Sequence, residues 1–225
     1  ALEDDMHRFH MRFEHADGRI TAVKAEALRH PWSACPGAAP HIAGELPGEL
    51  LGEVANRDPA QHCTHLYDLA VVMAAHANDT APTCFDMRAA DRVDDKMTAW
   101  LEQDGVERLR WLLDGTAIEG GGHHDGRDLR QLSKWKHEFP ADEAERATIL
   151  RRAVFVSGGR QFMPVSDRAA DQGSYRLGVC FNYQPEQAAH SVRRKDWRKD
   201  FAGLGLEPLG GFDPPSAFAA MGEQA

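Results

Sequence analysis

Hydrophobic and polar residues alternate over the first part of the chain. Residues 7–14 (HRFHMRFE) show the period of two that is typical of a half-buried strand. An Asp-Gly turn at 17–18 follows, and residues 20–28 return as a partner strand. The pattern therefore predicts a β-hairpin in which His7 lies on the apolar face and His10 on the solvent face.

The pattern then changes to a helical spacing. Residues 41–55 predict a short helix, or two half-helices hinged near Pro47. Residues 61–77 predict a longer helix, because its apolar positions recur with a period of about 3.6. These apolar positions are Leu66, Leu69, Ala70, Met73 and Ala77.

The rest of the chain predicts a meander of strands and further helices. Asp-Gly turns at 104–105 and 114–115 separate short alternating segments. A helix over 140–160 is indicated by Pro140 at its start and acidic residues in its first turn. The strands are predicted over 96–103, 106–113, 116–120, 130–139 and 175–184, and a final helix over 185–201.

Together these elements predict an α+β fold with one antiparallel sheet, made of the hairpin and the meander, and with helices packed on it. No linker divides the chain, so a single domain over residues 1–202 is expected. The Gly- and Pro-rich residues 203–225 predict a weakly ordered tail.

Composition changes this picture mainly by exclusion. The chain has 225 residues, 42% of them hydrophobic, and a net charge of −9. That acidic balance argues against binding to nucleic acid or docking on an anionic membrane. A small molecule is then the expected partner, and a homodimer is plausible because an antiparallel sheet has an exposed edge.

The four cysteines are scattered and form no Cys-x-x-Cys pair. The chain has no apolar run of about 18 residues and no signal-like start. We therefore expect reduced cysteines and a cytoplasmic protein. Nucleotide-binding, serine-hydrolase and zinc-protease motifs are also absent from the sequence.

Three stretches resemble one known family. The hairpin followed by RHPWSACP, then GELLGEV and HCTHLYDLA, is similar to the bacterial family catalogued as domain of unknown function 2889. The similarity covers roughly the first 80 residues and rests on His7, Cys35-Pro36 and residues 63–66 (Cys-Thr-His-Leu). The resemblance implies that these residues belong together, and it implies no established reaction.

The start of the 61–77 helix carries the strongest candidate chemistry. A cysteine at a helix N-terminus can become a usable thiolate, and imidazoles transfer protons near neutral pH. His7 points inward from the first strand and is the natural partner of this cluster. We therefore predict His7, Cys63 and His65 as catalytic residues.

A second group of candidates lies in the predicted sheet. The loop 120–128 (GGGHHDGRD) has the composition of a mobile active-site lid, although a solvated hairpin loop would look the same. Tryptophans on successive strands could line an apolar pocket or simply form core. The predicted substrate-binding residues are His123, His124, Trp111 and Trp135.

These residues favour a small catabolic enzyme that acts by acid–base chemistry, of lyase, hydratase or isomerase type, on an apolar or aromatic small molecule. No cofactor or metal is required by this interpretation. One alternative is a metal-dependent enzyme with zinc or another divalent ion at a site centred on Cys63 and His65, with ligands added from His7, Cys35, His123 or His124. Another is a non-catalytic module that binds a ligand or a protein partner.

Overall fold

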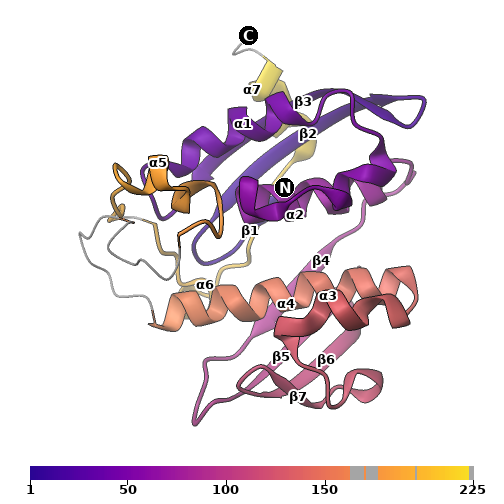
Figure 1. Cartoon of the computed structure of the whole chain (residues 1–225), viewed down its shortest axis with the longest axis vertical. Helices are drawn as coiled ribbons and strands as arrows, with labels where there is room; N and C mark the ends of the chain where they lie inside the picture. Colours follow the sequence, from indigo (N-terminus) through magenta and orange to yellow (C-terminus); the bar gives the residue numbers. More distant parts are fainter. Residues whose placement is uncertain (163–169, 171–176, 196, 223–225) are drawn as a thin grey trace. The chain divides into compact units, whose positions relative to one another are not determined.

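The computed structural model describes residues 1–162, 170, 177–195 and 197–222. The chain forms two compact units (Figure 1). Unit 1 contains residues 1–78 and 165–225, and unit 2 contains residues 79–164.

Unit 1 is built on a three-stranded antiparallel sheet in the order β1-β2-β3. Its strands are β1 (Leu2–Glu3), β2 (Arg8–Ala16) and β3 (Arg19–Arg29). Asp17 and Gly18 connect β2 and β3 with φ angles of 53° and 73°. Positive φ at both positions is the geometry that favours Asp-Gly in a tight hairpin. The predicted hairpin is confirmed.

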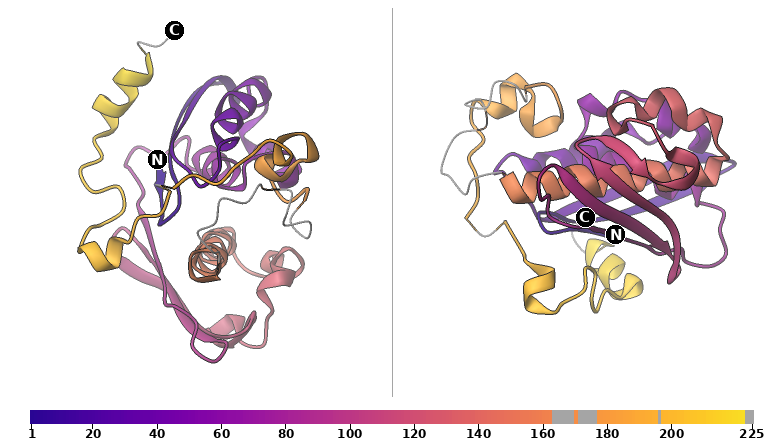
Figure 2. Two further views of the ribbon diagram at one scale, coloured as in Figure 1. Left: turned by 90° about the vertical axis from the view of Figure 1, so that its left-hand side faces the viewer. Right: turned by 90° about the horizontal axis from the view of Figure 1, so that it is seen from below.

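Two helices cover one face of this sheet (Figure 2): α1 (Ala38–Glu45) and α2 (Thr64–Ala75). A 3₁₀ helix over Leu51–Asn56 follows α1 after Pro47, which confirms two half-helices hinged at that proline. The largest fully buried side chains of this core are Phe9, Met11, Ile20, Ile42, Leu46 and Leu66.

The C-terminal part of unit 1 contains α5 (Pro185–Ala188), α6 (Phe201–Leu204) and α7 (Pro214–Gly222). The segment with α6 and α7, expected to be a weakly ordered tail, lies on the face of the sheet opposite α1 and α2 (Figure 2). Lys24 Nζ on β3 donates to the Met221 carbonyl at 3.2 Å.

This segment corrects the prediction for His10. The Phe212 ring lies 4.9 Å from the His10 ring, between centroids, and His10 is only 6% exposed. The expectation that His10 faces solvent is therefore wrong. Strand alternation alone predicts which face a residue is on, and here a segment some 200 residues away in sequence covers the second face.

Residues 175–184 were predicted as a strand, and no strand occurs in their described part, residues 177–184. Residues 175 and 176 lie outside the described residues. Phe181–Tyr183 form a 3₁₀ helix, and the Gly178 amide donates to the Tyr183 carbonyl at 2.7 Å. The chain therefore turns back on itself. The helix predicted over 185–201 is also wrong, since α5 ends at Ala188.

Unit 2 contains a four-stranded antiparallel meander in the order β4-β5-β6-β7. Three of its strands were predicted, and β4 was not. Its strands are β4 (Phe85–Ala89), β5 (Lys96–Gln103), β6 (Val106–Asp114) and β7 (Ala117–Gly120). The long helix α4 (Ala141–Phe162), also predicted, packs on the sheet through Ala147, Leu150 and Val154.

The predicted strand over 130–139 is wrong, because this segment is helical. It contains α3 (Leu132–Trp135), flanked by short 3₁₀ turns. The Asp128 carboxylate accepts the Arg130 amide at 2.7 Å and starts the first turn. Leu129, Leu132 and Trp135 are buried at a spacing of three, which matches a helical face and not a strand.

The α+β class with antiparallel strands and packed helices is confirmed. The hairpin and the meander were expected to form one sheet, and they form two separate sheets. Each sheet buries its own hydrophobic core, since the two clusters of buried residues share no member.

Candidate active site

Three side chains of unit 1 meet beside the start of β2. His7 Nδ1 lies 3.1 Å from Asp4 Oδ1 and 3.2 Å from Asp4 Oδ2. His65, in the first turn of α2, has Nε2 at 3.7 Å from Asp4 Oδ2. The His7 and His65 rings are stacked, with centroids 3.7 Å apart and planes inclined by 28°. The structure thus brings together two of the three residues that the sequence predicted as catalytic, His7 and His65.

The local sequence holds Asp4 in place. Its Oδ1 accepts the backbone amides of Met6 and His7, each at 2.7 Å. The Asp4 amide in turn donates to the His7 carbonyl at 2.9 Å. An aspartate that accepts amides two and three residues later is a common way to fix a tight turn. The turn between β1 and β2 thus holds the Asp4 carboxylate next to the His7 imidazole.

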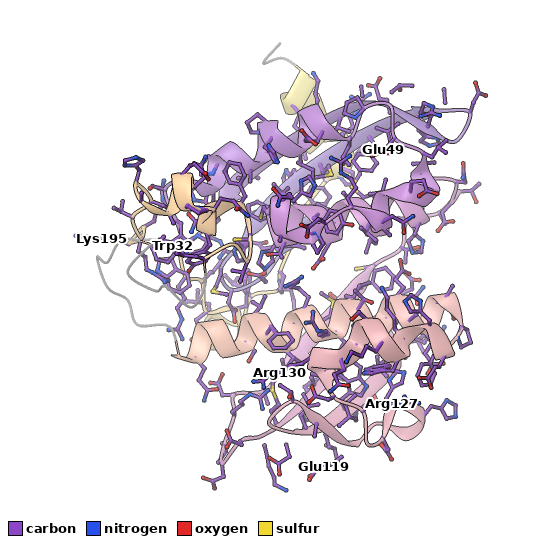
Figure 3. All side chains as sticks on the ribbon, in the orientation of Figure 1. Trp32, Glu49, Glu119, Arg127, Arg130 and Lys195 are labelled. Carbon is purple, nitrogen blue, oxygen red and sulfur yellow. The ribbon has the colours of Figure 1, made fainter. Side chains whose placement is uncertain are left out.

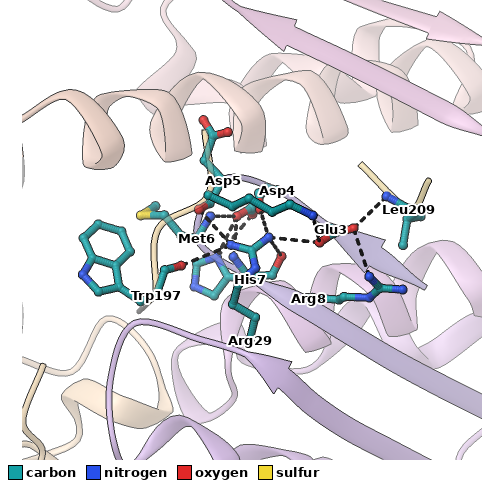
Figure 4. Close-up of polar contacts among 10 residues, drawn as sticks. Glu3, Asp4, Asp5, Met6, His7, Arg8, Arg29, Trp197 and Leu209 are labelled. Atoms are coloured by element: carbon teal, nitrogen blue, oxygen red, sulfur yellow. Dashed lines mark hydrogen bonds and ion pairs between the residues drawn. The ribbon is translucent and has the colours of Figure 1, made fainter. Parts of the chain in front are cut away.

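Arg29, the last residue of β3, forms hydrogen bonds with the backbone of this turn (Figure 4). Its guanidinium donates to the carbonyls of Asp4 at 2.5 Å, Asp5 at 2.8 Å and His7 at 3.2 Å. It also pairs with the Glu3 carboxylate at 3.2 Å. One side chain therefore fixes the backbone on both sides of the candidate site.

Glu3 joins the turn to the C-terminal segment. Its side chain is only 2% exposed and accepts the Leu209 amide at 2.7 Å (Figure 4). Arg8 lies 3.6 Å and Lys199 3.9 Å from its carboxylate oxygens. Together with Arg29, these side chains compensate the buried negative charge.

Asp4 is ionised in this arrangement. Burial by itself raises the pKa of a carboxyl group. Here the charge and hydrogen bond of His7, the charge of His65 and the Met6 amide outweigh burial and hold the pKa of Asp4 well below its ordinary value. An ionised carboxylate only accepts, so the His7 Nδ1 is the donor and Nε2 carries the lone pair in the neutral ring.

The two imidazoles lie close together beside one carboxylate, with their ring faces stacked. The nitrogens lie in the ring planes, so each ring can exchange a proton with a ligand and not across the stacked faces. Phe9 borders both, with ring centroids 5.4 Å from His7 and 6.3 Å from His65. The surroundings are thus partly apolar.

The Asp4 carboxylate should make the stability of the protein depend on pH. Because its pKa is lowered on folding, its contribution is present above its ordinary pKa of 3.8 and is lost as the pH falls through the folded value. We expect Asp4→Asn to lower the free energy of unfolding at pH 7 by on the order of 1–2 kcal/mol.

Urea unfolding at a series of pH values measures this difference, which should shrink as the pH falls below about 4. Asp17→Asn is the matched control: it removes the same charge from an exposed turn, where asparagine tolerates the positive φ. A difference between wild type and Asp4→Asn that is constant from pH 7 to pH 3 would rule out this role of the charge.

The same three residues fit a metal ion. One ligand atom each from Asp4, His7 and His65 lies within 4.8 Å of the other two. Two imidazoles and a carboxylate are a common ligand set for first-row divalent metals and leave positions open for substrate or water. Among the described residues, this is the one group of three or more potential ligands with such spacing.

Cys63 is not a member of this group. It precedes α2 as its N-cap, is 8% exposed, and packs in the core of unit 1. Its thiol acts electrostatically on Cys35, whose pKa is raised well above its ordinary value by burial and by the neighbouring Cys63 and Cys180. None of the four cysteines forms a disulfide. Cys63 thus belongs to the core beside Cys35 and is not part of the ligand group formed with His7 and His65.

The four predicted substrate-binding residues all lie in unit 2. The Trp111 indole donates from Nε1 to His124 Nδ1 at 3.0 Å, and the His124 ring lies 5.1 Å from that of Trp135. Trp111, Trp135 and His124 are buried, and burial lowers the pKa of His124 despite the nearby carboxylate of Glu143. The His123 side chain is 85% exposed.

Asp4 is the member of the site that sequence analysis missed. Its signal was the Asp-x-x-His spacing directly before the first strand, since an aspartate there can accept amides of the turn and reach the imidazole. Arg29 was missed for another reason: its hydrogen-bond partners lie 22 or more residues away in the sequence, and no local sequence pattern predicts them.

Comparison with family models, with curated proteins and with solved structures gives no match. The resemblance of residues 1–80 to domain of unknown function 2889 therefore stays an expectation. Among the described helices, none has the length and apolar character needed to cross a membrane.

Proposed function

We propose that this chain is a small cytoplasmic enzyme that transfers protons on an apolar or aromatic small molecule, in a reaction of lyase, hydratase or isomerase type. The observation that carries the proposal is the stacked His7–His65 pair bound to the ionised Asp4. His7 acts as the general base through Nε2, because Asp4 holds its other nitrogen as a donor. His65 receives or returns the second proton.

Asp4 takes a positioning role in this proposal. It fixes the tautomer and orientation of His7 and stabilises the positive charge that His7 gains, as a carboxylate does for a catalytic histidine in other enzymes. Phe9 is fully buried beside both rings and keeps their surroundings apolar on the core side.

A second candidate is a metal-dependent enzyme, favoured by the ligand spacing of Asp4, His7 and His65. A bound divalent ion would supply a water of lowered pKa or polarise a substrate oxygen. The three side chains would then hold the ion, and Arg29 would keep the Asp4 turn in the ligating conformation.

Deuterium exchange with a pool of compounds tests both candidates, because it does not require an identified substrate. Apolar and aromatic hydroxy acids, ketones and alkenes are incubated with the protein in D₂O, and each compound is followed by mass spectrometry. We expect incorporation into at least one compound, with His7→Ala and His65→Ala each reducing the rate at least about a hundredfold. His15→Ala, an exposed histidine at the far end of β2, should leave the rate unchanged.

Treatment with a chelator separates the two candidates. Exchange that persists in metal-free protein supports acid–base catalysis by the imidazoles alone. Exchange that is lost on chelation and restored by zinc or another divalent ion supports the metal centre. Equal rates in wild type and both histidine variants, or no incorporation into any compound, would contradict the proposed function and favour a non-catalytic module.

A further inference from the structure

A hollow in unit 2 has a charge that differs from that of the whole protein. It has a volume of about 390 Å³ and lies among β6, the loop after β7 and the start of α4. Its lining residues are Arg108, Leu109, Arg110, Gly121, Gly122, His123, Glu143 and Arg146. Three guanidinium groups thus face one carboxylate, although the chain carries a net charge of −9.

Two of the arginines are held in place by neighbours on the surface. Arg110 pairs with Glu107 and lies over the Trp100 ring at 4.9 Å. Arg146 pairs with Asp142. The two acidic partners are 42% and 66% exposed, so solvent screens both ion pairs. The Arg146 side chain is itself 17% exposed and also donates to Gln103 Oε1 at 3.1 Å.

Arg108 differs from both. It forms no ion pair or hydrogen bond with any residue in the described part of the chain. It is exposed and lines the hollow at an irregularity of β6, where Leu109 pairs with Leu101 and Glu107 pairs with Glu102. Its guanidinium group is available to a ligand in the hollow.

A buried histidine, His124, lies next to two lining residues of the hollow, His123 and Glu143. His124 is 1% exposed, and its Nδ1 accepts the Trp111 indole N–H, so in the neutral ring Nε2 carries the proton. Nε2 lies 3.2 Å from Glu143 Oε1 but makes no hydrogen bond there or with any other described residue. A buried donor without an acceptor is costly.

Glu143 links this donor to the hollow. Its Oε1 also lies 3.9 Å from His123 Nδ1, and it is the only carboxylate among the lining residues. A rotation of Glu143 toward His124 Nε2 would complete the missing hydrogen bond. The other acidic partners of the arginines, Glu107 and Asp142, are not among the lining residues.

The backbone wall of the hollow is fixed by Gly121. A Cβ at this position would lie 2.6 Å from Ile118 Cγ2 and 2.7 Å from Trp111 Cδ1, both in buried core residues. The loop therefore approaches the core more closely than any other residue type allows.

We propose that this hollow is a binding site for the oxyanion of a small molecule, a carboxylate or a phosphate. Guanidinium groups bind both anions through paired hydrogen bonds, and the volume suits a small ligand. All the residues involved belong to unit 2, so this inference does not depend on the proposed function of the Asp4–His7–His65 group in unit 1.

Isothermal titration of the full chain with inorganic phosphate and, separately, with benzoate tests the site. We expect saturable binding of at least one probe, weakened about tenfold in Arg108→Gln and in Arg146→Gln. The tighter probe shows whether a phosphate or a carboxylate is preferred. Arg130→Gln is the matched control, because Arg130 is exposed and is not among the lining residues. Figure 3 labels Arg130.

Three results would overturn the proposal: no saturable binding of either probe, unchanged affinity in Arg108→Gln, or an equal loss in Arg130→Gln. The last result would mean that the probes respond to overall charge. Arg108 is exposed and without described partners, so its variant should fold normally even if Arg146→Gln is destabilised.

Discussion

Replacing Arg29 by alanine should lower the free energy of unfolding of unit 1 by about 3–5 kcal/mol. The guanidinium donates to the backbone carbonyls of Asp4, Asp5, His7 and Trp197. It also compensates the Glu3 carboxylate, which is only 2% exposed. Removing it would leave a buried charge with weaker partners and several carbonyls without a donor.

Hydrogen exchange under increasing urea, followed in peptides from β2 and β3, reports the stability of unit 1 separately from that of unit 2. Arg12→Ala is the control, because Arg12 is 46% exposed and pairs with the exposed Glu14. It should change the free energy of unfolding by less than about 0.5 kcal/mol. Equal effects of Arg29→Ala and Arg12→Ala on the free energy of unfolding would contradict a stabilising role of the Arg29 contacts.

The double variant Glu3→Gln/Arg29→Ala tests the cause. If the uncompensated Glu3 charge accounts for much of the loss, neutralising it should recover part of the stability. Additive losses from the two substitutions would instead assign the effect of Arg29 to its hydrogen bonds with the backbone.

Replacing Trp111 by alanine should destabilise unit 2 by about 3–5 kcal/mol. Trp111 is fully buried on β6 and belongs to the core cluster formed with Leu132, Trp135 and Leu150. The substitution would leave a large cavity and would remove the donor to His124 Nδ1. Hydrogen exchange in peptides from β5 and β6 measures this loss.

Trp111→Phe separates packing from hydrogen bonding, because it keeps most of the ring and leaves His124 Nδ1 without its partner. We expect it to cost about 1–3 kcal/mol. Trp100→Ala is the control, since Trp100 is only half-buried on β5. A small effect of Trp111→Ala on stability would mean that Trp111 lines a ligand pocket, as the sequence allowed, and is not essential to the core.

Local sequence patterns predicted most of the secondary structure. The hairpin, the helix in residues 64–75, the meander and the long helix α4 depend on alternation, helical spacing and Asp-Gly turns, all of which act between near neighbours. Local patterns failed at 130–139. There the segment has few apolar residues, and burial in the core of unit 2 shows that Leu132 and Trp135 form a helical face.

The candidate site was only partly predictable. The inward position of His7 and the histidine at the start of the helix could be inferred, because each depends on one element. Cys63 lies two residues from His65, yet it packs in the core and interacts with Cys35, because it precedes the helix as its N-cap whereas His65 is part of the first turn. Loop residues such as His123 and His124 could be named, but their environments could not.

The sequence by itself therefore determined the α+β class, most of its regular elements and two of the three residues in the candidate site. The tertiary structure alone decided that Asp4 joins His7 to His65 and that Arg29 fastens the turn. It also decided that the C-terminal segment covers His10 and that three arginines surround one hollow. The physical reason is range. Strands and helices follow from interactions over a few residues, whereas ion pairs and buried clusters join residues that only the packed chain brings together.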